Sequence, residues 1–201
     1  GAANTAAYQL AGAGTQTAAL KMGGSPNGSS STNAVEEYNG SSWTSVTGMP
    51  GALSYTEGCG TQTAGLIAGT TTFEYDGTNW ANGGALNTPT GSCGQLAGIQ
   101  TASLIAGGDQ VPGPRQISTV AEYNGSAWTN VTSLPAARRS QGVAGTQTAS
   151  IFIGGQPNTN TTVEYDGTNW TSGGDLPANR RGMGGAGTST LAIGFGGNPG
   201  S

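Results

Sequence analysis

The segment 145–170, which reads GTQTASIFIGGQPNTNTTVEYDGTNW, decides the fold. A short apolar run at 149–153 ends at two glycines, and a second run at 162–165 ends at Asp166-Gly. Asp-Gly and Asn-Gly are strong β-hairpin signals, because these residues tolerate positive φ angles. The segment therefore predicts short antiparallel strands joined by tight turns.

Extended slightly at both ends, the segment makes one complete unit. We expect a strand at 140–144, a turn at 145–148, strands at 149–153 and 162–165, and a fourth strand that begins at Trp170. Four short antiparallel strands in about 40 residues are typical of one β-propeller blade. No part of the chain shows a sustained apolar period near 3.6 residues, so we predict no helix.

The unit recurs along the chain. The string Gly-Thr-Gln-Thr-Ala begins at Gly14, Gly60 and Gly145, and degenerate copies begin at Gly98 and Gly187. The first four copies are each followed by a tyrosine, then Asp-Gly or Asn-Gly, then a tryptophan. These aromatic residues are Tyr38, Trp43, Tyr75, Trp80, Tyr123, Trp128, Tyr165 and Trp170.

The order Gly-Gly, Glu-Tyr-Asp/Asn-Gly, Trp and Leu/Met-Pro resembles the kelch repeat of the galactose-oxidase/kelch-like superfamily. The resemblance covers nearly the whole chain and implies an all-β, kelch-like β-propeller in which the repeated Tyr and Trp pack between blades. The chain departs from the pattern at Gly69-Thr70, where the double glycine is broken. We expect one domain, 1–201, with four complete four-stranded blades and a partial fifth. The expected blade boundaries are approximately 3–50, 51–89, 90–135, 136–177 and, for the partial blade, 178–201.

The partial fifth blade leaves three alternatives open. It stays two-stranded, a second chain donates the missing strands, or the chain is a piece of a longer array. The alternating similarity of the units favours the array, since EYNGSSWTSVTGMP resembles EYNGSAWTNVTSLP and YDGTNWANGG resembles YDGTNWTSGG. Unpaired strand edges attract other strands, so we also expect a capacity for self-association through the incomplete blade.

Propeller topology sorts the loops onto two faces and gives two binding hypotheses. The face with the variable loops and Leu-Pro links would recognise one acidic or glycan ligand. Its candidate residues are Arg115, Arg138, Arg139, Arg180 and Arg181. The face with the uniform turns would offer one small sugar site in each blade. The candidate residues there are Gln16, Gln62, Gln100 and Gln147.

Composition excludes several other classes. With a net charge of −4 and a pI near 4.5, the chain lacks the basic patch that nucleic-acid binding needs. No apolar stretch reaches the length of a transmembrane helix, so no membrane insertion is expected. The absence of His rules out the usual copper and zinc ligand sets and a Ser-His-Asp triad. We expect no metal, no cofactor and no enzyme activity; Glu57 and Asp109 are the clear acids outside the repeat.

The cysteines, Cys59 and Cys93, fall on neighbouring equivalent strands but four positions apart along them. At 3.3 Å per residue this offset is about 13 Å, whereas bridged Cα atoms lie within about 7 Å. Two buried free thiols are therefore favoured over a disulfide, which stays an open alternative.

The bias toward Gly, Ala and Thr resembles microbial or phage surface repeat proteins such as tail fibres and adhesins. We therefore expect an extracellular or virion-associated module for recognition or adhesion, with a glycan or cell-surface partner. The alternative is a passive structural or assembly module that a neighbouring chain or a longer repeat array completes.

Overall fold

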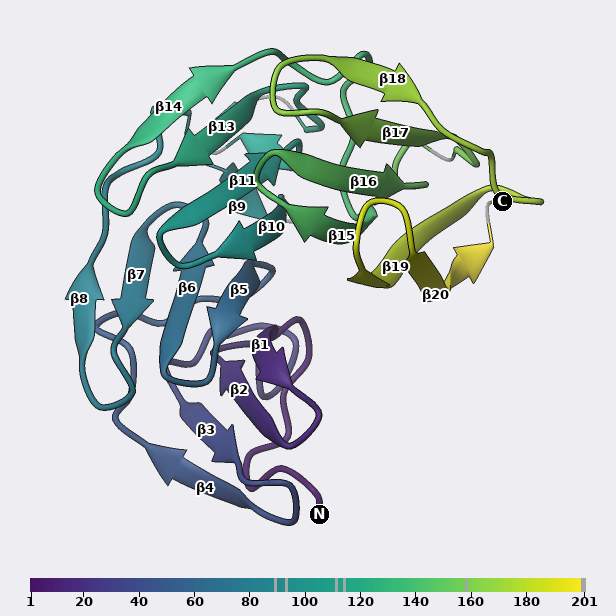
Figure 1. Ribbon diagram of the computed structural model, residues 1–201. Coiled ribbons are helices and arrows are strands. Elements are labelled where there is room, and N and C mark those ends of the chain that lie inside the picture. Colours follow the sequence, from purple (N-terminus) through teal and green to yellow (C-terminus); the bar gives the residue numbers. More distant parts are fainter. Residues whose placement is uncertain (89, 93, 111, 114, 158, 200–201) are drawn as a thin grey trace.

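The computed structural model describes residues 1–88, 90–92, 94–110, 112–113, 115–157 and 159–199. The described residues form strands, turns and loops and contain no helix, so the prediction of an all-β chain is confirmed. No described helix is therefore available to cross a bilayer. The strands form four four-stranded antiparallel sheets and two two-stranded pairs (Figure 1).

Sheets 1 and 2 are meanders of consecutive strands. Sheet 1 contains β1 (Ala11–Thr15), β2 (Ala18–Met22), β3 (Val35–Tyr38) and β4 (Trp43–Val46). Sheet 2 contains β5 (Glu57–Thr61), β6 (Ala64–Ala68), β7 (Thr72–Tyr75) and β8 (Trp80–Asn82).

Sheets 3 and 4 repeat this arrangement, and sheet 5 is a hairpin. Sheet 3 contains β10 (Gln95–Ile99), β11 (Ala102–Ala106), β13 (Val120–Tyr123) and β14 (Trp128–Val131). Sheet 4 contains β15 (Gly142–Thr146), β16 (Ala149–Ile153), β17 (Thr162–Tyr165) and β18 (Trp170–Ser172). Sheet 5 contains β19 (Arg180–Gly187) and β20 (Ala192–Pro199), and a small pair joins β9 (Thr90–Ser92) to β12 (Asp109–Gln110).

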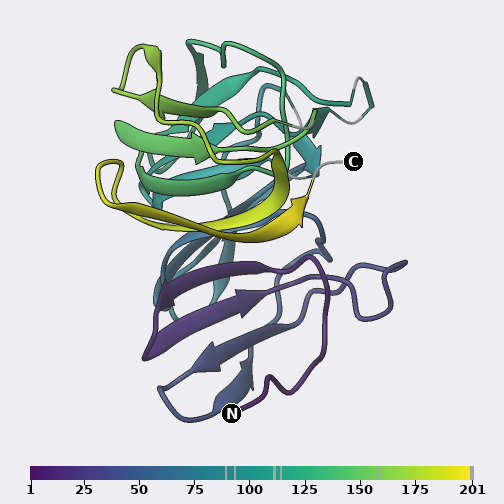
Figure 2. The ribbon, with the colours of Figure 1, turned by 90° about the vertical axis from the view of Figure 1, so that its right-hand side faces the viewer.

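The five sheets are arranged like the blades of a propeller. The innermost strands contact one another in chain order, β1 with β5, β5 with β10, β10 with β15 and β15 with β19. Together the sheets form an arc that is open between sheet 5 and sheet 1 (Figure 1). The view from the side shows the tight turns at one face and the long loops at the other (Figure 2).

The glycine that opens each Gly-Thr-Gln-Thr string has a steric reason to recur. Gly145 has a φ of 108°, and a Cβ there would lie 2.2 Å from the carbonyl oxygen of Ala149 on the paired strand. Only glycine tolerates both the left-handed backbone and this close approach. The inner hairpin of each unit therefore depends on this residue, which is why Gly14, Gly60, Gly98 and Gly187 occupy the same position.

The predicted strands of the fourth unit are largely confirmed. β16 and β17 have the predicted bounds and β18 begins at Trp170. The first strand was predicted at 140–144 with a turn at 145–148, whereas β15 spans Gly142–Thr146 and the turn is confined to 147–148. Ser140 has a φ of 54°, which no strand residue adopts, so the strand starts after it. The pair formed by β9 and β12 was not predicted.

The core consists of three apolar layers between successive sheets. The layer between sheets 1 and 2 includes Leu20 and Met22 from one sheet, and Ile67 and Phe73 from the other. Equivalent layers lie between sheets 2 and 3 and between sheets 3 and 4. Both faces of the middle sheets are therefore buried, and neighbouring sheets need each other for stability.

Three polar side chains in each of sheets 2, 3 and 4 also bond to the preceding sheet, and we call them the latch. In sheet 3, the Gln100 amide donates to the carbonyl oxygens of Gly65 (3.1 Å) and Tyr75 (2.8 Å) of sheet 2. The Tyr123 hydroxyl donates to Glu74 at 2.5 Å, and the Trp128 indole donates to the Thr72 hydroxyl at 3.0 Å. The tyrosine also stacks on the tryptophan of its own sheet, with ring centroids 4.8 Å apart.

Sheets 2 and 4 form equivalent latches, through Gln62, Tyr75 and Trp80, and through Gln147, Tyr165 and Trp170. Their tryptophans differ from Trp128 in donating to main-chain carbonyl oxygens, those of Thr47 and Thr132. Sheet 1 follows no sheet in the arc, so its Gln16 is exposed and its Tyr38 hydroxyl donates to Gly40 of its own turn. In Tyr75, Tyr123 and Tyr165, burial and the hydrogen bond to glutamate raise the phenol pKa to about 12. These phenols therefore remain protonated donors at physiological pH.

The equivalent glutamines of sheets 3 and 1 give a matched stability test. Replacing Gln100 with alanine removes two hydrogen bonds between sheets, and we expect the free energy of unfolding to fall by about 1–2 kcal/mol. Replacing Gln16, the equivalent exposed residue of sheet 1, should change it by less than about 0.5 kcal/mol. Urea unfolding followed by tryptophan fluorescence measures both, and equal losses would contradict the latch.

Candidate functional site

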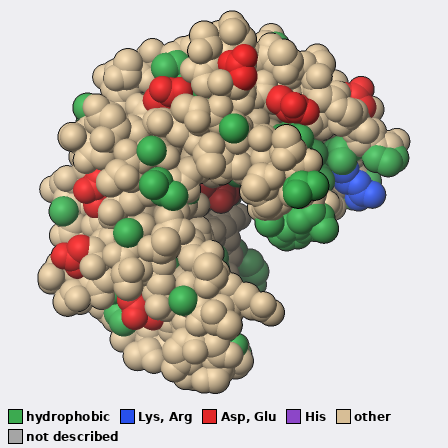
Figure 3. All heavy atoms as spheres, viewed as in Figure 1, with side chains coloured by type: hydrophobic (Ala, Val, Ile, Leu, Met, Phe, Trp, Pro, Cys, Tyr) green, Lys and Arg blue, Asp and Glu red, His purple; other side chains and the backbone are tan. Residues whose placement is uncertain are grey.

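A cavity of about 380 Å³ lies where the innermost strands of all five sheets begin. In the space-filling view a hollow lies at the centre of the arc, with acidic atoms visible inside it (Figure 3). Sheets 1 to 4 contribute residues at or just before the start of their inner strands, and sheet 5 contributes residues 182–184 from within β19. The lining residues are Gln9, Leu10, Tyr55, Thr56, Glu57, Gln95, Ser140, Gln141, Gly182, Met183 and Gly184.

The cavity is surrounded by residues in an unusual backbone conformation. Gln9, Tyr55 and Ser140 have φ angles of 54°, 60° and 54° and occupy the same position in units one, two and four. Among the described residues with positive φ, only Gln116 is a further non-glycine. Each such residue costs about 1–3 kcal/mol and persists only where the surroundings impose it. These three residues thus line the cavity in a strained backbone conformation.

Glu57 is the one carboxylate in the cavity lining, and it begins β5 where other units have Ala11, Gln95, Gly142 and Gly184. Burial raises its pKa to about 7, although a hydrogen bond from the Gln95 amide at 3.3 Å opposes the rise. The protonated carboxyl both donates and accepts hydrogen bonds. Close to neutral pH, Glu57 is therefore divided between a neutral and an anionic form.

Gln141 supplies a buried amide to the cavity wall. Its side chain is 0% exposed, and neither its Nε2 nor its Oε1 has a hydrogen-bond partner among the described residues. Two glycines leave room for it, since a Cβ on Gly155 would lie 2.7 Å from its Cγ and a Cβ on Gly107 3.0 Å from its Nε2. An unpartnered buried amide costs about 1–3 kcal/mol, which a hydrogen-bonding ligand would recover.

The arginines of the first binding hypothesis lie outside this lining and are not brought together. Arg139 pairs with Asp109 and donates to Gln156 at 2.7 Å, so Asp109 has the partner that the sequence did not reveal. Arg138 is only 5% exposed, and burial lowers the pKa of its guanidinium. Its Nε and Nη1 have no hydrogen-bond partner in the described part of the chain. Arg115 is exposed, while Arg180 and Arg181 are half-buried at the start of β19.

Three of the four glutamines of the second binding hypothesis are the latch glutamines. Gln62, Gln100 and Gln147 each donate Nε2 to two carbonyl oxygens of the preceding sheet. Their amide nitrogens are thus engaged within the fold. Of the two cysteines, Cys59 is free and buried, and burial raises its thiol pKa to about 12; Cys93 lies outside the described residues.

The lining as a whole is of mixed character. It combines amide, hydroxyl and carboxyl groups with the apolar side chains of Leu10 and Met183. No cluster of three or more His, Cys, Asp or Glu able to hold a metal occurs among the described residues. Of the lining residues only Glu57 was singled out in the sequence, because it is an acid outside the repeat. Gln9, Gln95, Ser140 and Gln141 were missed, although each differs in type from its counterparts in other units.

No protein-family model and no curated protein sequence matches the chain. Similarity of structure is extensive, and 180 chains of solved structures match. One of them, described as "Structure of YjhT", superimposes with a TM-score of 0.77 at 11% sequence identity, over 97% of this chain and 74% of that chain. At this identity the likeness supports the propeller-like fold and says nothing of function.

Proposed function

We propose that the chain is a kelch-type propeller module, with four complete blades and a partial fifth, that binds a neutral glycan in the central cavity. The observation that carries this proposal is Gln141, a fully buried amide that lines the cavity and has no hydrogen-bond partner among the residues that the structure describes. Sugar hydroxyls donate and accept hydrogen bonds, as the surrounding amide and carboxyl groups require. The cavity has the size of a small-ligand site.

The proposal is of binding and not of catalysis. Glu57 has the pKa of a general acid, but the described lining supplies no second carboxylate, which glycoside hydrolysis generally uses. The composition, rich in Gly, Ala and Thr, supports a place at an extracellular or virion surface, where a rigid glycan-binding module would serve adhesion. Self-association and a purely structural role are the alternatives to this proposal.

A variant of Gln141 separates binding from folding. Gln141→Met keeps the volume but removes the unpartnered amide, so we expect the free energy of unfolding to rise by about 1 kcal/mol or more. The same change should weaken glycan binding at least tenfold, because the ligand loses its buried partner. A glycan array identifies the ligand, and calorimetric titration with wild type and variant measures the affinity.

Two further variants test the rival sites. Arg139→Ala and Arg115→Ala should leave affinity within about twofold, since neither residue lines the cavity. Loss of binding in these variants, with full binding by Gln141→Met, would place the site on the arginine face and overturn the proposal. The absence of any glycan ligand would favour a structural role instead.

A further inference from the structure

Tyr55 occupies a position whose backbone conformation is fixed by the repeat. Its amide donates to the carbonyl oxygen of Gln9 at 3.0 Å, and the amide of Gly182 donates in the same way to Ser140 at 2.8 Å. All four residues have positive φ angles, between 54° and 66°. Hydrogen bonds between sheets thus accompany the left-handed backbone at this position, although its side chain differs from unit to unit.

A tyrosine is an unfavourable choice for this position. A bulky residue with a positive φ is strained, whereas glycine, which sheet 5 has as Gly182, adopts this backbone freely. Tyr55 is also 41% exposed, so much of its apolar ring surface remains in contact with water. Strained residues cluster at ligand-binding sites, and a strained, part-exposed aromatic side chain in a cavity wall therefore indicates a ligand contact.

Tyr55 lines the cavity together with polar groups of three consecutive sheets. Glu57 follows it at the start of β5, and the Gln95 amide of sheet 3 donates to Glu57 at 3.3 Å. Gln141 of sheet 4 adds an amide with no partner among the described residues. Gln95 and Gln141 are 5% and 0% exposed, so the hydrogen-bonding groups lie deeper in the wall than the aromatic ring.

An aromatic ring beside buried hydrogen-bonding groups matches the two kinds of surface of a pyranose. A pyranose carries hydroxyl groups around its rim and C–H groups on its faces, so it needs polar partners and an apolar plate together. Tyrosine supplies a large, rigid contact area at a low cost in conformational entropy. A linear polyol has the same hydroxyl groups but no such face.

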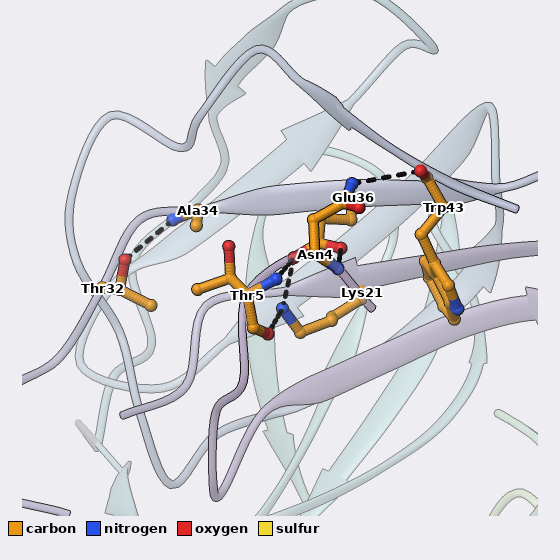
Figure 4. Close-up of polar contacts among 7 residues, drawn as sticks. All are labelled: Asn4, Thr5, Lys21, Thr32, Ala34, Glu36 and Trp43. Atoms are coloured by element: carbon orange, nitrogen blue, oxygen red, sulfur yellow. Dashed lines mark hydrogen bonds and ion pairs between the residues drawn. The ribbon is translucent and has the colours of Figure 1, made fainter. Parts of the chain in front are cut away.

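A departure from the repeat does not by itself indicate a ligand. In sheet 1, Lys21 stands opposite Glu36 where sheet 2 has two apolar residues. Lys21 donates to Glu36 at 2.8 Å and to the carbonyl oxygen of Thr5 at 2.7 Å (Figure 4). The backbone amides of Asn4 and Thr5 donate to Glu36 as well. This buried pair has its partners within the chain, which Gln141 at the cavity lacks among the described residues.

We propose that the ring of Tyr55 stacks on the sugar in the cavity and selects neutral pyranosides that have one face free of axial oxygen atoms. This inference rests on the proposed function, because it concerns the same ligand in the same cavity. The C–H face of the sugar would lie on the phenol ring, and its rim hydroxyls would bond to Glu57 and Gln141. Axial oxygens on both faces would hold the sugar away from the ring and weaken binding.

The probes are the methyl β-pyranosides of glucose, galactose, mannose and N-acetylglucosamine. The methyl α-pyranosides of galactose and mannose, which have axial oxygens on both faces, and the acyclic sorbitol are their controls. In NMR titrations of the whole chain we expect saturable binding of at least one β-pyranoside, with its C–H protons shifted upfield by the aromatic ring. Sorbitol, or the α anomer of a β-pyranoside that binds, should bind at least about tenfold more weakly. Equal affinity of a control would overturn the inference.

Three variants test the role of the ring. Tyr55→Phe keeps the ring, so its affinity should stay within about twofold of wild type. Tyr55→Ser introduces the residue that sheet 4 has at this position, Ser140, and should weaken binding about tenfold. Tyr8→Ser is the matched control, since Tyr8 is a 66% exposed tyrosine outside the cavity lining, and it should bind normally. Thermal melts of the variants establish that each is folded.

The outcomes separate this inference from the proposed function. Binding that Gln141→Met weakens and Tyr55→Ser leaves unchanged would retain a glycan site in the cavity and overturn the stacking role of Tyr55. Equal losses in Tyr8→Ser and Tyr55→Ser would also overturn it, because the sugar would then contact tyrosines without regard to the cavity. If none of the pyranosides binds the wild-type chain, the proposed function is wrong and this inference fails with it.

Discussion

Replacing Lys21 with methionine is expected to lower the free energy of unfolding by about 3–5 kcal/mol. Lys21 is 4% and Glu36 0% exposed, so the variant leaves a buried carboxylate that only backbone amides still neutralise. Breaking a buried ion pair is costly for this reason, even where the pair itself contributes little. Urea unfolding of wild type and variant measures the loss, and a change below about 1 kcal/mol would contradict it.

The double variant Lys21→Ile with Glu36→Phe is the control. It reproduces the Ile67–Phe73 pair of sheet 2, and replacing a buried ion pair by apolar residues is often neutral. We expect stability within about 1 kcal/mol of wild type, together with release of the N-terminal segment, seen as faster hydrogen exchange at Asn4 and Thr5. A double variant as unstable as the single one would show that the site does not tolerate apolar residues.

The contribution of the Lys21–Glu36 pair to stability should depend on pH. Burial raises the pKa of Glu36, but the hydrogen bonds from Lys21, Asn4 and Thr5 outweigh burial and hold the pKa below its usual value. The ionised carboxylate therefore stabilises the fold above pH 4.5 or so, and this stabilisation is lost as the pH falls through the lowered pKa. The destabilisation by Lys21→Met should accordingly be smaller in acid than at neutral pH.

Much of the fold is local in origin, which is why the sequence predicts it. The hairpin of Tyr165 and Trp170 follows from Asp166-Gly, because the Asp166 carboxylate accepts hydrogen bonds from the amides of Thr168 and Asn169 within the turn. The glycine of each Gly-Thr-Gln-Thr string is required because a Cβ there would clash with a carbonyl oxygen of its own hairpin. Such contacts span few residues, so a repeating pattern reveals them.

The contacts that shape the candidate site join residues far apart in the sequence, and they produce no repeating sequence pattern. Arg139 meets Asp109 only because a link between two sheets runs beside a variable loop, and this pairing engages a side chain that looked free for a ligand. Arg138, next to it, turns inward instead of outward. The Gln141 side chain is accommodated because Gly107 and Gly155 leave space for it, and these glycines come from two different units.

Stability should also depend on pH through Glu57, with the opposite sign to Glu36. Burial raises the pKa of Glu57 from 4.5 to about 7, so the folded chain holds a proton between these values that the unfolded chain has lost. The free energy of unfolding should therefore fall as the pH rises from about 4.5 through 7. A shift of this size corresponds to about 3 kcal/mol.

The variant Glu57→Gln should not show this fall in the free energy of unfolding with rising pH, since an amide does not ionise. We expect the variant to match wild type near pH 4 and to exceed its free energy of unfolding by up to about 3 kcal/mol near pH 8. Urea unfolding across this range measures the difference, with Asp175→Asn as the exposed control. A pH-independent difference between variant and wild type would show that Glu57 ionises normally in the fold.

The same variant connects stability to the proposed ligand. A neutral glycan that fills the cavity deepens the burial of Glu57 and accepts a hydrogen bond from its protonated form, so wild-type affinity should decline above pH 7 or so. Glutamine keeps a donor at that position at every pH. Glu57→Gln should therefore bind the glycan with an affinity that does not change between about pH 5 and 8. A parallel decline of affinity in both proteins would show that Glu57 does not contact the ligand.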